Sequence, residues 1–537
     1  MEPQTGVRER SVQTNLRDSH QRQPVSGGLL SASVAMALLV AAPGDLAAQA
    51  TQRDRAATGP AGAPTLAACR LPLPSRGDRD GGLSAIHLER QQGRPFLLTP
   101  SLTFRQTYTD NVTLSRDDEE SEFISELIPA VSFCRIGPRF RVQTDYQAQL
   151  LHYWDDSSRN DVLHTLNADS TTSVIQERLF LDAGATYEQQ PITSRGAFSR
   201  DNALATRNRA DALTLRASPY LLQDFGPVGS SVTRYAYSRT NYNEGVPNVT
   251  RHLGSFNLVS PDAADPFSWR ASVRSERVRR EDIDPRARYF DDAFLELGYL
   301  ITDRLRVVGR GGYETEPRPD GSQDRFGSSY WDAGLRWEGD RTQIEGRYGR
   351  RFFGDTYFGL ISHQTARLDL SLSYRETQQI SDRFTIGEQT FQIEIDPVTG
   401  DPELISLVDI EREIFVRKRT TGSAAYETGR SRVVLRGFHE RREFVVAGDS
   451  EERYGADAFW RWQWLPRTAV IPRAGWERLE FREGRDDDLW LAQISVAHLL
   501  SPQMQAGATL RRQHRSSDDR AAQYTENAVI LELTRVF

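Results

Sequence analysis

Two clusters of acidic residues are the most conspicuous candidates for chemistry in this chain. They are Asp117-Asp118-Glu119-Glu120 and Asp486-Asp487-Asp488. Carboxylate oxygens are the ligands that calcium prefers, so either cluster could hold a hard cation. Neither has the ligand spacing of a defined calcium loop, and solvated, mutually repelling loop tips are the favoured interpretation. We therefore expect no metal site and no cofactor.

Motifs for catalysis are missing from the sequence. It contains no His-Glu-x-x-His pair, no Gly-x-Ser-x-Gly elbow and no phosphate loop, and its nine histidines have no ligand spacing. A hydrolase site assembled from distant strands stays open as an alternative, because a single sequence does not reveal one. The sequence favours a protein that is not an enzyme.

Single charged residues recur at alternate positions within apolar stretches, on the side opposite the apolar residues. If the apolar side faces lipid, these charges line a water-filled interior. Guanidinium groups match carboxylates and phosphates, and Arg or aromatic planes can also face sugars, so such a wall could select solutes. The simpler interpretation is that any wide lumen must be charged because water fills it. The lumen-facing candidates are Arg105, Arg141, Asp145, Arg216, Arg270, Arg274, Glu296, Arg306, Arg336, Glu345, Arg367, Asp369 and Arg461.

The segments that carry these charges have the period of half-buried β-strands. From Phe96 onward, Leu102, Phe104 and Tyr108 share one side of a period-two pattern, while Arg105 and its polar neighbours share the other. The pattern recurs to the end of the chain, and no long segment has a helical period. The sequence therefore predicts an all-β fold.

The connections between these segments alternate between short and long. Short links include Thr302-Asp303, Gly339-Asp340, Ser381-Asp382, Pro466-Arg467 and Ser501-Pro502, and longer polar loops span 111–122, 189–209, 277–287, 314–327 and 396–409. Short turns on one side and long loops on the other are typical of outer-membrane barrels, which have an even number of strands. We predict a large antiparallel transmembrane barrel of about 22 strands, within a range of 18–22, with short periplasmic turns and longer extracellular loops.

A soluble sandwich or a β-solenoid would show the same alternation. Four features favour the membrane: strand lengths that fit a bilayer, the alternating connections, a signal peptide, and aromatic residues at strand ends such as Tyr108, Tyr299 and Trp464. We therefore expect the protein in the outer membrane of a Gram-negative bacterium. Its expected partners include outer-membrane lipid and the barrel-insertion machinery.

The N-terminal region reads as an export signal followed by a lead-in. Residues 1–50 combine early arginines, an apolar run and small residues before Ala50, which predicts a secretory signal peptide, although a later start codon stays open. Residues 51–95 are rich in Ala, Gly, Pro, Arg and Asp, which predicts an extended periplasmic segment. We expect residues 96–537 to form the barrel.

The remaining composition narrows the function classes. The net charge is -7, and the 67 basic residues, with Lys418 the only lysine, are mixed evenly with acidic ones. Without a basic face, nucleic-acid binding is not expected. Only Cys69 and Cys134 are present. An exported chain allows a disulfide between them, which would hold the lead-in at the lumen entrance, but two unpaired thiols stay open.

The opening strand resembles that of a family of outer-membrane β-barrel porins. The matching residues are Thr99-Pro100-Ser101-Leu102-Thr103 followed by Tyr108-Thr109-Asp110-Asn111-Val112. Within that family, the chain is most similar to proteins associated with exopolysaccharide and PEP-CTERM/exosortase gene clusters. The resemblance implies an outer-membrane location and a surface-polysaccharide context, and it supplies no catalytic residues. The C-terminal Phe537 also resembles a barrel-insertion signal, although Arg535 departs from it.

Three functions are compatible with these expectations. The leading hypothesis is export or surface assembly of an exopolysaccharide, with periplasmic polysaccharide-export proteins and the polysaccharide itself as partners. The alternatives are a general diffusion porin and a non-transporting structural or adhesive surface barrel.

Overall fold

A computed structural model describes most of the chain from Phe96 onward. The described residues are 96–537 except 193–194, 198, 200, 207, 244–245, 262–264, 282–286, 318–324, 381–413 and 445–447. The predicted signal peptide, the lead-in at 51–95 with Cys69, the link Ser381-Asp382 and the loop 396–409 lie outside the described residues, so these expectations stay predictions.

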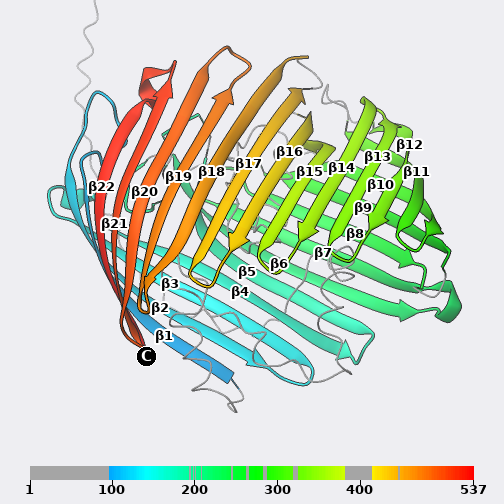
Figure 1. Cartoon of the computed structure of the whole chain (residues 1–537), viewed down its shortest axis with the longest axis horizontal. Coiled ribbons are helices and arrows are strands. Elements are labelled where there is room, and N and C mark those ends of the chain that lie inside the picture. The colour runs from blue at the N-terminus through cyan, green and yellow to red at the C-terminus, as the bar shows by residue number, and fades with distance from the viewer. Residues whose placement is uncertain are drawn as a thin grey trace, which may run out of the picture. The chain divides into compact units, whose positions relative to one another are not determined.

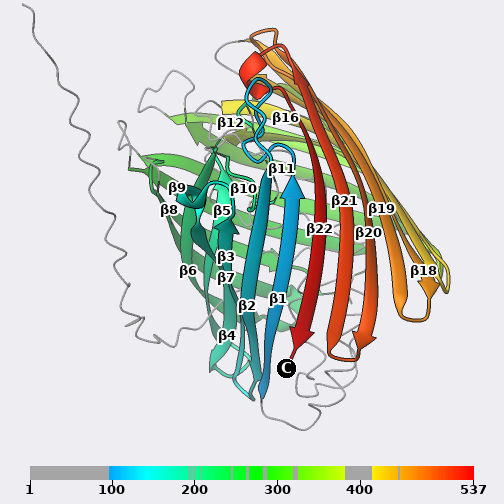
Figure 2. The ribbon, with the colours of Figure 1, turned by 90° about the vertical axis from the view of Figure 1, so that its left-hand side faces the viewer.

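The described residues form 22 antiparallel strands in one sheet, in which each strand pairs with its neighbours along the chain. β1 also pairs with β22, from Ser101↔Val536 to Thr109↔Ala528, which closes the sheet into a barrel (Figures 1 and 2). The predicted fold class is confirmed. The strands are β1 (Phe96–Thr109), β2 (Glu122–Ile136), β3 (Phe140–Tyr153), β4 (Asp161–Ile175), β5 (Leu179–Pro191), β6 (Arg209–Asp224), β7 (Ser230–Tyr242), β8 (Val249–Val259), β9 (Phe267–Arg280), β10 (Ala287–Thr302), β11 (Leu305–Pro317), β12 (Arg325–Glu338), β13 (Thr342–Arg351), β14 (Gly354–Gln364), β15 (Leu368–Ile380), β16 (Ile414–Glu427), β17 (Ser431–Phe444), β18 (Ser450–Leu465), β19 (Thr468–Glu480), β20 (Asp486–Ser501), β21 (Met504–Ser517) and β22 (Tyr524–Val536), and the short 3-10 turns are η3 (Ser157–Arg159), η4 (Gly226–Val228) and η6 (Arg520–Ala522).

The two ends of the barrel differ in their connections. The start of β1 and the C-terminus lie at one end, where β10 to β11, β12 to β13 and β18 to β19 are joined by two or three residues. The opposite end carries the β1–β2 loop (110–121) and the β5–β6 loop (192–208). Because short turns face the periplasm in outer-membrane barrels, the first end is the periplasmic end and the second the extracellular end.

The alternation along each strand separates an apolar outer face from a polar inner face. On β1, Phe104 is 47% exposed on the outside, whereas Thr103 is 3% exposed on the inside. Tyr108 and Thr107 repeat the contrast four residues later. β-Branched and aromatic residues suit such a half-covered pleated surface, which is why this sequence forms strands.

Aromatic side chains gather in two bands on the outer face. Near the periplasmic end, the rings of Trp460 and Trp462 lie 5.6 Å apart, and Trp464 follows at 6.4 Å from Trp462. Near the extracellular end, the rings of Tyr348 and Trp331 lie 5.9 Å apart. Such girdles mark the two interfaces of a bilayer. Together with the closed, outwardly apolar wall, they place the protein in the bacterial outer membrane.

Within the part of the chain that the structure describes, no helix is both long and apolar enough to cross a bilayer.

A substitution on the outer face directly tests which face of the barrel wall contacts lipid. Leu531 on β22 is 54% exposed at an outward position near the middle of the strand, so Leu531→Arg should place a charge in hydrocarbon. We expect a loss of about 2–4 kcal/mol in the free energy of unfolding, measured by urea titration in bilayers. Gln147→Arg, at an inward position on β3, is the control and should cost far less. Equal losses would contradict the assignment of the two faces.

Candidate functional site

The inner face of the barrel is the candidate site, and it holds most of the residues predicted to line a lumen. The structure places these at inward positions on strands: Arg105, Arg141, Asp145, Arg216, Arg270, Arg274, Glu296, Arg306, Arg336, Glu345, Asp369 and Arg461. Whether they act on a solute stays a prediction.

Arg367 is different. It lies in the exposed periplasmic turn between β14 and β15, not on the lumen wall. The turn closes because the Thr365 amide donates to the Leu368 carbonyl at 2.8 Å, and the Thr365 hydroxyl accepts from the Leu368 amide at 2.9 Å. The strand therefore begins one residue after Arg367.

The lumen charges of β10 to β13 form a connected lattice of ion pairs. Arg347 on β13 lies at its centre, 2.7 Å from Glu296, 3.3 Å from Asp332 and 2.5 Å from Glu345. Arg336 also donates to Glu345 at 2.8 Å. Because carboxylates neutralise these guanidinium groups, this wall presents positively charged hydrogen-bond donors next to negatively charged acceptors.

A second lattice covers β16 to β18. The carboxylate of Glu440 is fully buried and accepts from Arg417 at 2.6 Å, Arg442 at 2.7 Å and Arg419 at 3.3 Å. A buried carboxylate needs such partners, because an isolated charge in this setting would be strongly disfavoured.

Aromatic rings on the inner face lie beneath several of these arginines. The Arg351 guanidinium lies 4.7 Å from the Tyr330 ring centre, and the Arg419 guanidinium lies 5.1 Å from that of Phe438. Both contacts are within cation–π range. Sequence reasoning missed these rings, although Tyr330 and Phe438 occupy positions of polar-face parity.

The β5–β6 loop folds into the lumen and reaches the opposite wall. Arg195 in this loop lies 3.3 Å from the buried carboxylate of Glu451 on β18 and 2.8 Å from Glu483 in the β19–β20 link. The guanidinium of Arg195 also lies 5.2 Å from the Phe481 ring centre. The loop thus joins strands that are far apart around the barrel.

Two more arginines hold the backbone of this loop. Arg485 donates to the Arg195 carbonyl at 2.8 Å, and Arg515 on β21 donates to the Gly196 carbonyl at 2.6 Å. Both arginines also bind Asp487 on β20, whose side chain is fully buried like that of Arg515. This cluster of charge-assisted hydrogen bonds fixes the loop to the wall.

A third anchor lies deeper in the lumen. Asp201 in the β5–β6 loop lies 2.7 Å from Arg511, which also pairs with Glu526 at 2.9 Å. Burial alone would raise the pKa of the Asp201 carboxyl, but Arg511 and Arg105 outweigh burial and hold that pKa below its ordinary value. A lowered folded-state pKa stabilises the loop above the unfolded value, near 4. This contribution is lost only as the pH falls below that value.

Apolar residues from two loops form a small core inside the extracellular half. Val112 and Leu114 of the β1–β2 loop and Ala203 and Leu204 of the β5–β6 loop are at most 1% exposed. They pack against inward side chains of β2, β3, β4 and β22, including Tyr153. The core is tied by the Tyr153 hydroxyl, which donates to the Ala203 carbonyl at 2.8 Å, and by the Ala205 amide, which donates to the Val112 carbonyl at 2.9 Å. The two loops therefore narrow the extracellular half of the lumen.

Members of both acidic clusters pair with arginines in the fold. Asp117 pairs with Arg520 at 3.0 Å, and Asp486 pairs with Arg478 at 2.7 Å. Among the described residues, no group of three or more His, Cys, Asp or Glu side chains is arranged to hold a metal ion.

Cys134 on β2 is 3% exposed at an inward position near the periplasmic end, and it is disulfide-bonded. The bridge predicted from the sequence joins it to Cys69, which lies outside the described residues. That pairing stays a prediction.

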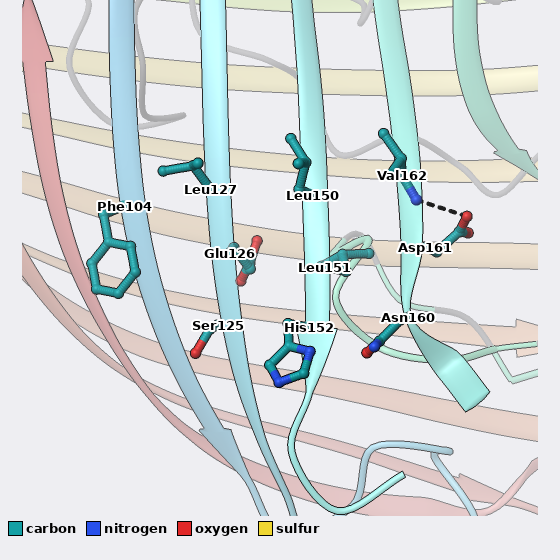
Figure 3. A pocket seen from close by; sticks show the side chains of 10 residues that line it. All are labelled: Phe104, Ser125, Glu126, Leu127, Leu150, Leu151, His152, Asn160, Asp161 and Val162. Atoms are coloured by element: carbon teal, nitrogen blue, oxygen red, sulfur yellow. Dashed lines mark hydrogen bonds between the residues drawn. The ribbon is translucent and has the colours of Figure 1, made fainter. Parts of the chain in front are cut away.

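A recess of about 630 Å³ lies in the wall of β1 to β4 (Figure 3). Its lining includes Phe104, Leu127, Leu150 and Val162, all exposed on the outer face. Hydrocarbon chains of the bilayer face this side, so we do not assign the recess to the lumen.

Comparisons with known proteins agree with the fold. No family model matches the sequence, and no curated protein matches it. Among solved structures, the chain is similar to the FrpB iron transporter from Neisseria meningitidis (F3-3 variant), with 9% identity over 84% of this chain and 82% of that chain and a TM-score of 0.51. It is also similar to the siderophore receptor PirA from Acinetobacter baumannii, with 9% identity over 82% and 80% and a TM-score of 0.51. The likeness shows a shared barrel fold. The solutes in those names are those of the two neighbours, and the likeness does not assign them to this chain.

Proposed function

We propose that this barrel is a conduit that carries a hydrophilic solute across the outer membrane through a lumen narrowed at its extracellular half. The observation that carries this proposal is the inner face, where ion-paired lattices line one wall and two loops are anchored within the lumen. One structural neighbour is named an iron transporter and the other a siderophore receptor, which supports a role in moving solutes across the outer membrane. That the chain is not an enzyme stays a prediction.

The finer proposal is that the solute is a saccharide chain, moved during export or surface assembly of an exopolysaccharide. Sugar hydroxyls both donate and accept hydrogen bonds, so a wall of paired Arg and carboxylate groups suits them better than a uniformly basic wall would. Rings such as Tyr330, covered by guanidinium planes, add flat surfaces to that wall. The resemblance of the opening strand to PEP-CTERM/exosortase-associated proteins gives further support, with periplasmic export proteins as partners.

Oligosaccharide blockade in planar bilayers tests the solute class. Because charges of both signs line the wall, we expect a reversal potential near zero in a KCl gradient. We also expect brief current blocks by oligosaccharides, and fewer by polyethylene glycol of the same size, which has hydroxyl donors only at its two ends. Strong anion selectivity without saccharide blocks would instead favour a channel for small anions.

The biological role needs a separate experiment in the source cells. A strain that lacks this protein should export less polysaccharide, and the full chain should restore export. Normal export by that strain would count against the finer proposal and leave the conduit standing. Rapid swelling of liposomes in small sugars would favour the general diffusion porin.

A further inference from the structure

Arginines recur in the periplasmic turns. The backbone carbonyl of each arginine accepts a hydrogen bond from an amide near the end of an adjacent strand. The distance is 2.8 Å for Arg367, 2.7 Å for Arg430 and 2.8 Å for Arg467. The backbone beneath each guanidinium is therefore fixed. The turn arginines are Arg139, Arg178, Arg304, Arg341, Arg367, Arg430 and Arg467, and all seven are exposed.

The two halves of this rim differ in charge. In the turns that join β4 to β5, β10 to β11 and β12 to β13, an acidic residue directly precedes the arginine, as in Asp303-Arg304 and Asp340-Arg341. Arg304 also lies 3.1 Å from Asp340. An acidic residue therefore offsets the positive charge in each of these three turns.

The other half carries arginines without such neighbours. We define the periplasmic arc as Arg367, Arg430, Arg467 and Arg535, from the turns after β14, β16 and β18 and from the end of β22. All four are exposed, and none forms an ion pair with another residue that the structure describes. The carboxylates of Asp369 and Glu427, nearest in sequence, are at inward positions.

The arc lies at the depth of a membrane interface. Tyr426, Trp462 and Trp464 are at outward positions within five residues of Arg430 or Arg467 and belong to the periplasmic aromatic band. Arg535 is itself on the outward face of β22, with its guanidinium 4.9 Å from the Phe537 ring centre. An arginine on the lipid side of the wall must extend its head toward the headgroups.

We propose that the periplasmic arc binds the phosphate groups of anionic phospholipids in the periplasmic leaflet. Guanidinium groups bind phosphate oxygens in a bidentate manner, and the neighbouring aromatic rings sit where acyl chains meet headgroups. A soluble acidic partner would approach from the periplasm. It would not require an arginine on the lipid side beside an aromatic band.

The test compares lipid binding by the wild-type full chain and its variants. Each is refolded in nanodiscs of neutral phosphatidylcholine that contain fluorescent phosphatidylglycerol. The Arg367→Gln, Arg430→Gln, Arg467→Gln and Arg535→Gln quadruple variant should bind phosphatidylglycerol at least about tenfold more weakly, since each interfacial arginine contributes to attraction of anionic lipid. The matched control replaces Arg178, Arg304 and Arg341, which each follow an acidic residue, by Gln and should bind like wild type. Heat-modifiable migration confirms that each variant is folded.

Further variants keep the proposal falsifiable. If the quadruple variant does not fold, the triple variant that keeps Arg535 should still lose most of the binding. Arg-to-Lys substitution in the arc should restore part of it, because the charge returns without the bidentate geometry. Equal loss in the arc and control variants would overturn the proposal. Arc-dependent binding of soluble polyglutamate without phosphatidylglycerol binding would overturn it in favour of an acidic partner.

Discussion

Replacing residues 195–206 of the β5–β6 loop with a short Gly-Ser linker should raise the single-channel conductance several-fold. This segment carries the Arg195 clamp to Glu451 and Glu483 and the Asp201 anchor on Arg511. It also supplies Ala203 and Leu204 to the apolar core inside the lumen. A barrel of 22 strands is wide enough for a channel unless something fills it. Without the loop, the extracellular half should widen.

The matched control is a Gly-Ser replacement of residues 225–229, the link at the periplasmic end of β6. It changes a connection of the same strand without touching the loop anchors, so its conductance should stay at the wild-type value. A loop-shortened barrel that is folded yet conducts no better than wild type would show that the β5–β6 loop does not limit the lumen.

Asp487→Ala should cost about 3–5 kcal/mol in the free energy of unfolding. Asp487 and Arg515 are both fully buried, and Asp487 also pairs with Arg485 at 2.7 Å. Removing the carboxylate leaves the Arg515 charge buried beside a second arginine. Urea titration of the refolded protein, followed by heat-modifiable migration, measures the loss.

The control for this prediction is Asp340→Ala. Asp340 pairs with Arg304, but the two side chains are 84% and 54% exposed, so the loss should stay below about 1 kcal/mol. A double variant, Asp487→Leu with Arg515→Met, should recover part of the stability because no charge is left unpaired. Similar losses for Asp487→Ala and Asp340→Ala would show that the buried cluster is not a structural anchor.

The barrel itself could be predicted because its signal is local. Period-two alternation around residues such as Phe104 and Arg105 identifies both the strands and their two faces, and short links such as Thr302-Asp303 identify the periplasmic end. Strand boundaries were less certain, and Arg367 shows why. Its parity fits a lumen position, but the turn hydrogen bonds of Thr365 place it outside the strand.

The internal architecture of the lumen could not be predicted, because its contacts join residues far apart in the sequence. Arg195 and Glu483 are 288 positions apart, and Arg347 and Glu296 are 51 apart. Pairings of that kind depend on strand order and register, which a single sequence does not specify. One clue was available: Leu204 and Val112 are apolar residues in loops that are mostly polar, and both are buried in the structure.

Single-channel recording in planar bilayers tests the conduit most directly. The purified, folded full chain should give discrete current steps, and the loop-shortened barrel should give larger ones. A loop-shortened barrel that is folded and inserted but passes no current would contradict a transport function and leave a structural or adhesive surface barrel as the better account.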